Sequence, residues 1–159
     1  AALLGAEGEC FKALSGTLDA GNVYLAAEML GICQESFDRT LQYLKERKQF
    51  GVLIGSFQAL QHRAADWWSQ VELCKSVVLK ALQAMDEGDV KAPALASVAK
   101  AKLCQVTELS TNEAVQMHAG IGMTDEYEIG FFMKRARPAQ IMFGDNSYHT
   151  DRFALLSRY

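Results

Sequence analysis

The sequence of 159 residues is long enough for one domain with a buried core, since half of its residues are hydrophobic and 22% are charged. The net charge of −3 gives no reason to expect a nucleic acid as partner. No apolar run approaches the roughly 18 residues that a membrane span needs, so we expect no membrane insertion. The chain begins with neither a methionine nor a basic-then-apolar leader, and we expect a fragment or a processed piece of a longer protein.

Four cysteines are spread widely along the chain: Cys10, Cys33, Cys74 and Cys104. Because no two of them form a CxxC pair, the spacing argues against a zinc knuckle and against a disulfide framework. The pattern favours buried, reduced thiols in a cytoplasmic protein.

Apolar residues recur at helical spacing in the first two long segments, residues 20–48 and 56–87. The apolar stripe of the first segment consists of Leu25, Met29, Cys33, Phe37, Leu41 and Leu44. That of the second alternates steps of three and four through Phe57, Leu60, Ala64, Trp67, Val71, Cys74, Val78 and Ala81. This second stripe predicts a seam that packs on another helix at a shallow angle, ending before Gly88.

Three further helices are expected, from about Pro93 to 118, over 126–142 and, as a short last element, over 146–157. Both prolines, Pro93 and Pro138, are expected near the edges of periodic segments. No alternating strand pattern of useful length occurs. The sequence therefore predicts an all-α fold, an up-and-down four-helix bundle with a short extra C-terminal helix.

The segment ERKQFGVLIGSFQ between the first two helices offers groups suited to a ligand. Arg47 can donate two hydrogen bonds to a phosphate or carboxylate, and Gln49 and Gln58 add neutral donors. Phe50 and Phe57 could supply apolar walls or stack on a flat ring. The alternative is structural, since a basic residue and a glycine at a helix C-terminus also form an ordinary helix end.

Two other motifs are open to a functional and a structural interpretation. Gly120 and Gly122 in QMHAGIGM could let the backbone approach a ligand, or could simply end a helix. The cationic MKRARP segment, with Lys134, Arg135 and Arg137, could equally be a solvated helix face. No Glu has a His three positions later, and neither a GxSxG nor an HExxH motif occurs, so no metal site is predicted.

Taken together, ERKQFG, GSFQALQHRAADW, QMHAGIGMTDEY and FMKRARPAQIMFGD resemble the C-terminal helical domain of acyl-CoA dehydrogenases, over residues of about 18 to 157. The resemblance implies a four-helix bundle from an FAD-dependent oxidoreductase of fatty acid metabolism, which introduces an α,β double bond into an acyl-CoA thioester. Complete enzymes of the family also carry an N-terminal helical domain and a middle β-domain. Neither is expected within residues 1–159, which we interpret as a single domain.

Particular residues carry the implied FAD contacts. Arg47 and Gln49 match contacts to the FAD phosphates and ribitol that are made across a subunit interface. Ala119 stands where the family usually has glycine. Asp19 matches a position near the acyl-CoA, whereas Asn22 replaces an arginine that would hold the substrate. The full set of implied cofactor contacts is Arg47, Gln49, Phe50, Phe57, Gln58, Gln116, Met117, His118, Ala119, Gly120, Asp145 and Ser147.

The catalytic base is missing from its usual places. The family keeps a glutamate in the final loop, where this chain has Phe143, or early in the first bundle helix, where it has Gly21. Proton abstraction beside a thioester needs a group of suitable basicity. Asp145, Asp19 or Glu126 could substitute, a Glu-bearing homologous subunit could supply the base in a heteromer, or the reaction could differ.

Two hypotheses follow for the whole protein. In the first, this domain belongs to an acyl-CoA dehydrogenase-like enzyme that binds FAD and acyl-CoA and forms a homotetramer, a dimer of dimers. In the second, it is a non-catalytic interaction domain that completes a partner's FAD site in a heteromeric enzyme. Under either hypothesis the 159 residues alone are expected to be inactive.

Overall fold

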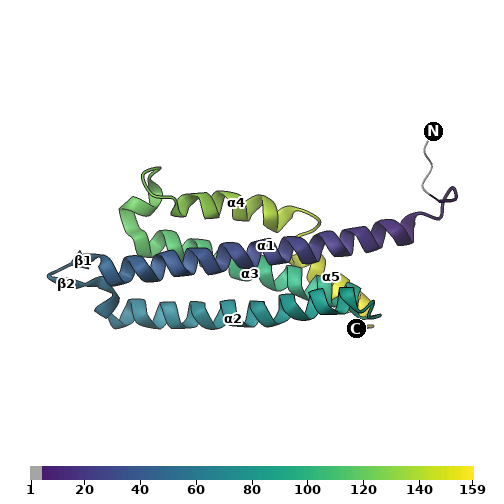
Figure 1. The fold of residues 1–159 in the computed structure, drawn as a ribbon, viewed down its shortest axis with the longest axis horizontal. Coiled ribbons are helices and arrows are strands. Elements are labelled where there is room, and N and C mark those ends of the chain that lie inside the picture. Colours follow the sequence, from purple (N-terminus) through teal and green to yellow (C-terminus); the bar gives the residue numbers. More distant parts are fainter. Residues whose placement is uncertain (1–4) are drawn as a thin grey trace.

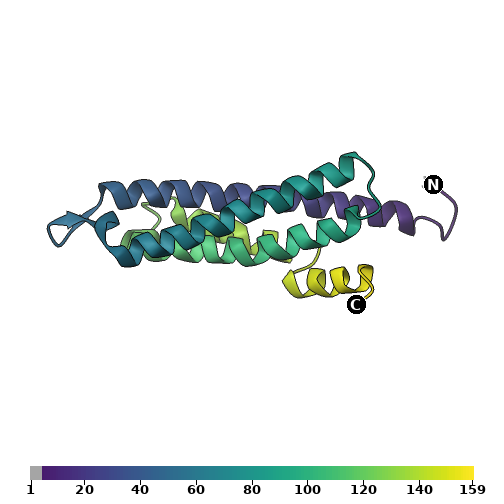
Figure 2. The ribbon, with the colours of Figure 1, turned by 90° about the horizontal axis from the view of Figure 1, so that it is seen from below.

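Three long helices run side by side along the molecule in alternating directions (Figure 1). A computed structural model of the chain describes residues 5–159. The long helices are α1 (Phe11–Glu46), α2 (Gln58–Asp86) and α3 (Ala92–His118). The shorter α4 (Ile129–Ile141) packs on α1 and α3 and completes the up-and-down four-helix bundle. The last helix, α5 (Asn146–Leu156), lies outside the bundle against α3 (Figure 2).

The central element is α3, which contacts each of the other four helices. The predicted all-α bundle with a short C-terminal helix is thus confirmed. Small side chains on α3 allow this close approach, and they are completely buried: Ala96, Ser97, Ala99, Thr107, Ser110 and Ala114. The large side chains come from the facing helices, since Trp67 of α2 lies edge-on to Phe37 of α1 at 5.0 Å. The Trp67 indole donates to the Ser110 hydroxyl at 2.8 Å, so its polar group is satisfied.

Helix α1 begins at Phe11, nine residues before the predicted start near residue 20. Its first turns project beyond the neighbouring helices (Figure 1), and Phe11, Leu14 and Leu18 are exposed there. Because these residues have no buried apolar partner, the buried stripe that predicted the helix begins further along. Within residues 5–159, no helix is both long and apolar enough to cross a lipid bilayer.

A small β-hairpin joins α1 to α2, where the sequence predicted no strand. Strand β1 (Lys48–Gln49) pairs antiparallel with β2 (Val52–Leu53), and the short 3₁₀ helix η1 (Ile54–Ser56) follows. The two turn residues, Phe50 and Gly51, have φ of 55° and 82°, as in the two-residue turns that favour hairpins. Gly55 is required where η1 meets α1, because a Cβ there would lie 2.8 Å from the Leu44 carbonyl oxygen.

Two other expectations hold in part. Pro138 lies near the end of α4, as predicted, but it stands inside the helix. It is tolerated because it stands in the last turn, where the missing N–H removes a single helical hydrogen bond. Cys33, Cys74 and Cys104 are buried thiols as predicted, whereas Cys10 is exposed just before α1.

The loop between α4 and α5 is held to α3 by two buried side chains. The Lys100 ammonium donates to the carbonyls of Gln140 at 2.9 Å and Gly144 at 2.8 Å. His149 of α5 accepts a hydrogen bond from Ser97 through Nδ1, at 3.4 Å, and donates from Nε2 to the Phe143 carbonyl, at 3.2 Å. The lowered pKa of the ring favours the neutral form, in which Nδ1 is the acceptor and the Ser97 hydroxyl is the donor.

Several charged groups face His149. Burial lowers its pKa to about 4, from 6.5, and the neighbouring positive charge of Lys100 acts in the same direction. Arg152 also lowers this pKa, whereas the Phe143 carbonyl and the Asp145 carboxylate raise it. Between pH 6.5 and 4 the unfolded chain therefore binds a proton at this position that the folded chain does not bind.

The free energy of unfolding is expected to fall as the pH drops from 6.5 towards 4, by up to about 3 kcal/mol for His149, since one pKa unit corresponds to about 1.4 kcal/mol. Urea denaturation of wild type and His149→Gln at several pH values measures this dependence. His149→Gln should flatten it, leaving the contributions of other groups, such as His118, whose pKa burial lowers, and Asp19, whose pKa burial raises. The exposed His62→Gln is the matched control, and equal slopes for His149→Gln and wild type would contradict this account.

Candidate functional site

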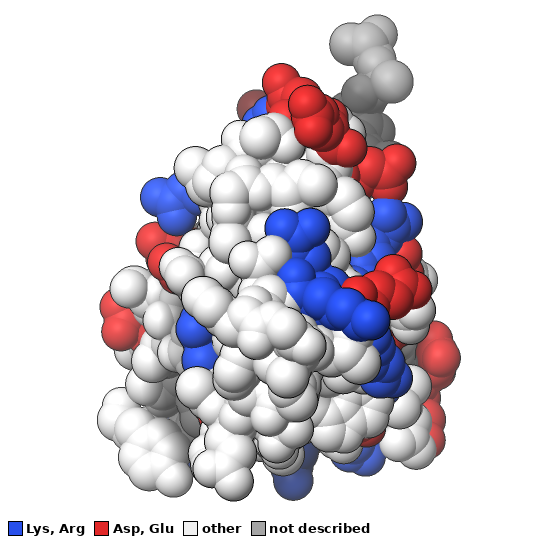
Figure 3. All heavy atoms as spheres, turned by 90° about the vertical axis from the view of Figure 1, so that its left-hand side faces the viewer, with Lys and Arg blue, Asp and Glu red and all other residues white. Residues whose placement is uncertain are grey.

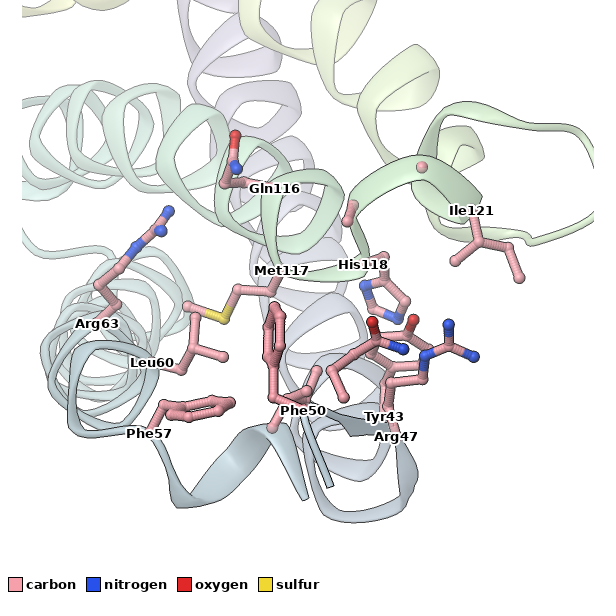
Figure 4. Close-up of a pocket in the computed structure, with 14 residues that line it drawn as sticks. Tyr43, Arg47, Phe50, Phe57, Leu60, Arg63, Gln116, Met117, His118 and Ile121 are labelled. Atoms are coloured by element: carbon pink, nitrogen blue, oxygen red, sulfur yellow. The ribbon is translucent and has the colours of Figure 1, made fainter. Parts of the chain in front are cut away.

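The hairpin, the start of α2 and the end of α3 enclose a cleft of about 500 Å³ at one end of the bundle (Figure 4). We call it the hairpin cleft. The 3₁₀ helix η2 (Ala119–Met123), which follows α3, adds to its rim. Its lining residues are Tyr43, Arg47, Gln49, Phe50, Ile54, Phe57, Leu60, Arg63, Gln116, Met117, His118, Ala119, Gly120 and Ile121. Figure 3 faces this end of the molecule, where several basic side chains lie close together, next to acidic side chains and to uncharged surface.

Nine of the twelve residues that the sequence singled out as cofactor contacts line this one cleft: Arg47, Gln49, Phe50, Phe57, Gln116, Met117, His118, Ala119 and Gly120. Gln58, the first residue of α2, is exposed next to Phe57 but does not line the cleft. Asp145 and Ser147 lie at the start of α5, towards the opposite end of the bundle (Figure 1).

Sequence reasoning missed five lining residues: Tyr43, Ile54, Leu60, Arg63 and Ile121. A helical register would have found part of this set. Tyr43 stands one turn before Arg47, and Leu60 and Arg63 follow Phe57 at steps of three, so each shares a helix face with a residue that was predicted.

The two arginines of the hairpin cleft differ in their charge environment. Arg63 is paired with Glu113 of α3, with Nη2 2.7 Å from the carboxylate. Arg47 follows the last residue of α1, and its backbone N–H donates to the Tyr43 carbonyl. Within residues 5–159 its guanidinium has no ion-pair partner. An anion that entered the cleft would therefore be drawn to Arg47, whose fork of N–H donors matches a phosphate or carboxylate.

His118 fixes the turn at the end of α3. Its ring packs against those of Tyr43, at 4.3 Å between centroids, and Tyr127, at 4.8 Å. Nδ1 donates to the Ala114 carbonyl at 2.8 Å, and burial lowers the pKa of the ring, so His118 is neutral. Nε2 is then a buried acceptor without a hydrogen-bond partner among the described residues. These contacts orient the 116–120 segment that forms one wall of the hairpin cleft.

Ala119, which stands where the family usually has glycine, differs from glycine in its backbone preferences as well as in its side chain. Ala119 has φ 55° and ψ −135°, a conformation that glycine adopts readily and other residues rarely. Gly122 is required for a different reason, because a Cβ there would lie 2.9 Å from the Val115 carbonyl oxygen. The tight turn of η2 thus depends on one glycine and one strained alanine.

A second, smaller cleft of about 160 Å³ lies between the start of α1, the loop before α5 and α5 itself. We call it the Asp19 cleft. Its lining residues are Phe11, Leu14, Ser15, Leu18, Asp19, Asn22, Phe143, Tyr148 and Arg152. Asp19 is buried and forms an ion pair with Arg152 of α5, in which Oδ1 lies 2.7 Å from Nη2. Burial raises the pKa of the Asp19 carboxyl above its ordinary value, and Arg152 opposes part of that rise.

The two positions where a glutamate was expected are neighbours in space. A Cβ built on Gly21 would lie 3.1 Å from Cε2 of the Phe143 ring, so the ring fills the space beside the glycine. Phe143 has φ 60° and the following Gly144 φ 109°. Any side chain at Gly144 would collide with the Tyr148 ring. A hydrophobic contact therefore replaces the carboxylate at both positions.

The other two candidate carboxylates lie elsewhere. Asp145 caps α5, since its Oδ1 accepts a hydrogen bond from the Tyr148 backbone N–H at 2.9 Å. It lines a separate cleft, formed with α3 and α4. Glu126 is exposed in the loop before α4, at the same end of the bundle as the hairpin (Figure 1). No group of three or more metal-ligating side chains occurs among the described residues.

The cationic MKRARP segment follows the structural interpretation. Arg135 pairs with Glu28 of α1 through two hydrogen bonds, at 2.6 and 3.0 Å. Lys134 lies 3.5 Å from Asp125 and over the Phe131 ring. These two ion pairs are exposed and contribute little to stability, whereas Arg137 lines the separate cleft that also includes Asp145.

Comparisons with known proteins identify the family and the fold. The family described as "Acyl-CoA dehydrogenase, C-terminal domain" matches residues 8–154. The chain is 39% identical over 142 residues to a probable acyl-CoA dehydrogenase of Bacillus subtilis, covering 87% of this chain and 36% of that protein. It is 33% identical over 144 residues to cyclohex-1-ene-1-carbonyl-CoA dehydrogenase of Syntrophus aciditrophicus, covering 91% and 35%.

Among solved structures, butyryl-CoA dehydrogenase from Megasphaera elsdenii matches with a TM-score of 0.94 and 33% identity, over 98% of this chain and 40% of that one. The chain thus spans about a third of the length of the curated relatives it matches. By its sequence match and its shared fold, the chain belongs to the acyl-CoA dehydrogenase family and corresponds to the C-terminal domain of its members.

Proposed function

We propose that the complete protein is an FAD-dependent acyl-CoA dehydrogenase and that this domain contributes the hairpin cleft to its flavin site. The observation that carries the proposal is the convergence of the Arg47 turn and the 116–120 turn on one cleft. The substrate is an acyl-CoA thioester, which loses a proton from its α-carbon and a hydride from its β-carbon. We further propose a cytoplasmic homotetramer, a dimer of dimers, that acts in fatty acid metabolism.

The chemistry of the hairpin cleft fits FAD, a diphosphate that joins two flat ring systems. Arg47 is a cation that forms no ion pair with any described residue, and it is suited to a diphosphate oxygen. The rings of Phe50 and Phe57, 6.3 Å apart and nearly perpendicular, offer an apolar wall for a flat ring. When bound, FAD would supply the hydride acceptor of the reaction. The residues of this chain would hold its diphosphate and exclude water from its rings.

Asp145 and Ser147 cannot serve the same FAD molecule as Arg47 within one chain. Asp145 and Ser147 follow Phe143, whose ring touches Gly21 of α1. Gly21 and Arg47 are about 26 residues apart along α1, which corresponds to about 39 Å at 1.5 Å per residue. That separation exceeds the length of an extended FAD molecule. Under the proposal, each chain therefore contributes to two different flavin sites, one at each end of the bundle, and an oligomer is needed to complete both.

Arg47→Ala in the complete protein should weaken FAD binding, because a hydrogen bond to a charged group is worth about 1.5 to 3 kcal/mol. The dissociation constant is expected to rise about 10- to 150-fold. Titration of the flavin-free protein with FAD, followed by flavin fluorescence, measures the change. Lys45→Ala, two residues earlier on α1 and outside the hairpin cleft, is the matched control. An unchanged dissociation constant for Arg47→Ala would remove Arg47 from the proposed site.

A second candidate function is supported by the contact between Phe143 and Gly21, which leaves no carboxylate at either usual position of the base. In this alternative the chain belongs to a non-catalytic subunit, which completes the FAD site of a homologous subunit that carries the glutamate. The fold and the hairpin cleft would be the same in both cases. The two functions differ only in which polypeptide removes the proton.

Purified complete protein, loaded with FAD and free of other subunits, distinguishes the two functions. We expect it to oxidise acyl-CoA alone, measured as bleaching of the flavin absorbance and reduction of an artificial electron acceptor. Turnover that appears only after a Glu-bearing homologous subunit is added would contradict the first function and support the second. An equal amount of that subunit assayed by itself is the control.

A further inference from the structure

We propose that Asp19 is the base of this chain: its carboxylate accepts the α-proton of an acyl thioester bound in the Asp19 cleft, and Arg152 positions it. The inference rests on the proposed function, because it assigns a group to the proton-transfer step of that reaction. It differs from the usual arrangement of the family, in which the glutamate stands at position 143 or 21.

The position of Asp19 in its cleft supports its role as the base. Among the described residues that line the Asp19 cleft, Asp19 is the only carboxylate, and the Phe143 ring lines the same cleft. Phe143 also touches Gly21, so the aromatic ring connects Asp19 to both positions at which the family places its base. Asp19 therefore shares a cleft with the side chain at one of the two usual positions of the base and lies two residues before the other.

The hydrogen bonds of Asp19 leave one oxygen available. Oδ1 is 2.7 Å from Nη2 of Arg152. The other terminal nitrogen of Arg152 donates to Ser97 at 2.9 Å and to the Pro93 carbonyl at 3.2 Å, which holds the guanidinium on α3. Oδ2 has no hydrogen-bond partner among the described residues, and it is not one of the fully buried unpaired atoms. One carboxylate oxygen is thus anchored and the other is free to receive a proton.

The surroundings make this carboxylate more basic than an exposed aspartate. The apolar walls of the Asp19 cleft come from Leu14, Leu18 and Phe143, and burial raises the pKa of Asp19. Arg152 opposes part of this effect, so the carboxyl still ionises while it faces apolar groups. A base needs this combination of a fixed orientation and a raised proton affinity.

Asn22 provides an independent indication that the Asp19 cleft receives a ligand with hydrogen-bond donors. Its side chain is 3% exposed and lines the cleft one turn after Asp19. Nδ2 donates to the Leu18 carbonyl at 3.0 Å, whereas Oδ1 is buried without a partner among residues 5–159. A buried acceptor without a partner costs free energy unless a ligand or water satisfies it. An amide N–H of the pantetheine arm of an acyl-CoA supplies a donor of the right kind.

The other carboxylates are excluded by geometry. Asp145 uses Oδ1 to cap α5 and lines a cleft that shares no residue with the Asp19 cleft. Glu126 belongs to the loop before α4, whereas Phe143 belongs to the loop after it, and these two loops lie at opposite ends of α4 (Figure 1). Asp19 remains as the acidic side chain placed to act.

The proton transfer conserves atoms and charge. The bond between the α-carbon and its hydrogen breaks, its electron pair delocalises into the thioester carbonyl to give an enolate, and the proton bonds to Oδ2 of Asp19. The carboxyl group becomes neutral while Arg152 keeps its positive charge. The step is reversible and involves no oxidation. It therefore exchanges the α-hydrogen with solvent whether or not the β-hydride leaves.

Exchange of the α-hydrogen with D₂O is accordingly the test, performed on the complete FAD-loaded protein and read by mass spectrometry of the recovered thioester. The probes are butyryl-CoA, 2-methylbutyryl-CoA and cyclohexanecarbonyl-CoA, and the one that binds most tightly by calorimetry is used. We expect Asp19→Asn to slow exchange at least about 100-fold, as for loss of a general base, with the dissociation constant changed less than threefold. Glu126→Gln is the control and should exchange like wild type.

A second variant covers the case in which Asp19→Asn loses its fold. Because Arg152 lowers the pKa of Asp19, Arg152→Gln should move the pH profile of exchange to higher pH. A merely structural role of Arg152 would change the amount of folded protein and leave the midpoint of this profile in place.

Each outcome separates the two proposals. If none of the three thioesters binds, the proposed function fails. If a thioester binds but wild type does not exchange its α-hydrogen, or Asp19→Asn exchanges as fast as wild type, the assignment of Asp19 is overturned while the proposed function stands. An unshifted pH profile for Arg152→Gln would likewise overturn the pairing of Arg152 with the base.

Discussion

The packing of α1 against α3 is the constraint on which the rest of the structure depends. Small, fully buried side chains of α3, such as Ala99 and Ala114, let the two helices approach closely over most of their length. The two walls of the hairpin cleft are the ends of these same helices, since Arg47 directly follows α1 and the 116–120 segment ends α3. The stack of Tyr43 on His118 joins the two ends. A change in the register of α1 on α3 would separate the cationic wall from the turn opposite it.

Helix α3 also organises the opposite end of the molecule. Lys100 and Ser97 of α3 hold the loop that carries Phe143, the first directly and the second through His149. Ser97 also accepts a hydrogen bond from Arg152, the partner of Asp19. One rigid element therefore fixes both clefts, although they lie at opposite ends of the bundle. This arrangement suits a domain that contributes to two sites in an assembly rather than to one site within a single chain.

Much of the fold could be predicted from the sequence, because the apolar stripes of long helices repeat many times. The seam of α2 was correct from Trp67 to Ala81, where all the predicted positions are buried. The hairpin could not be predicted in this way, since strands of two residues are too short to show an alternating pattern. The start of α1 was missed because Phe11 and Leu14 are exposed. Motif resemblance grouped nine residues that line the hairpin cleft, whereas periodicity alone left each of them with a structural explanation.

Contacts between distant parts of the sequence were beyond sequence reasoning. The Phe143 ring beside Gly21 and the Asp19–Arg152 ion pair each join residues more than a hundred positions apart. Without these contacts, the three candidate carboxylates could not be ranked. Asp145 in particular stood closest in sequence to the expected glutamate, yet its side chain serves as a helix cap.

The central claim, that the hairpin cleft receives part of a flavin dinucleotide, is tested most directly by an experimental structure of the complete protein with FAD. The account predicts density for the FAD diphosphate within hydrogen-bond distance of the Arg47 guanidinium. It also predicts that the adenosine half of FAD lies between Arg47 and the 116–120 turn. FAD held elsewhere, with the hairpin cleft open to solvent in every subunit, would contradict it.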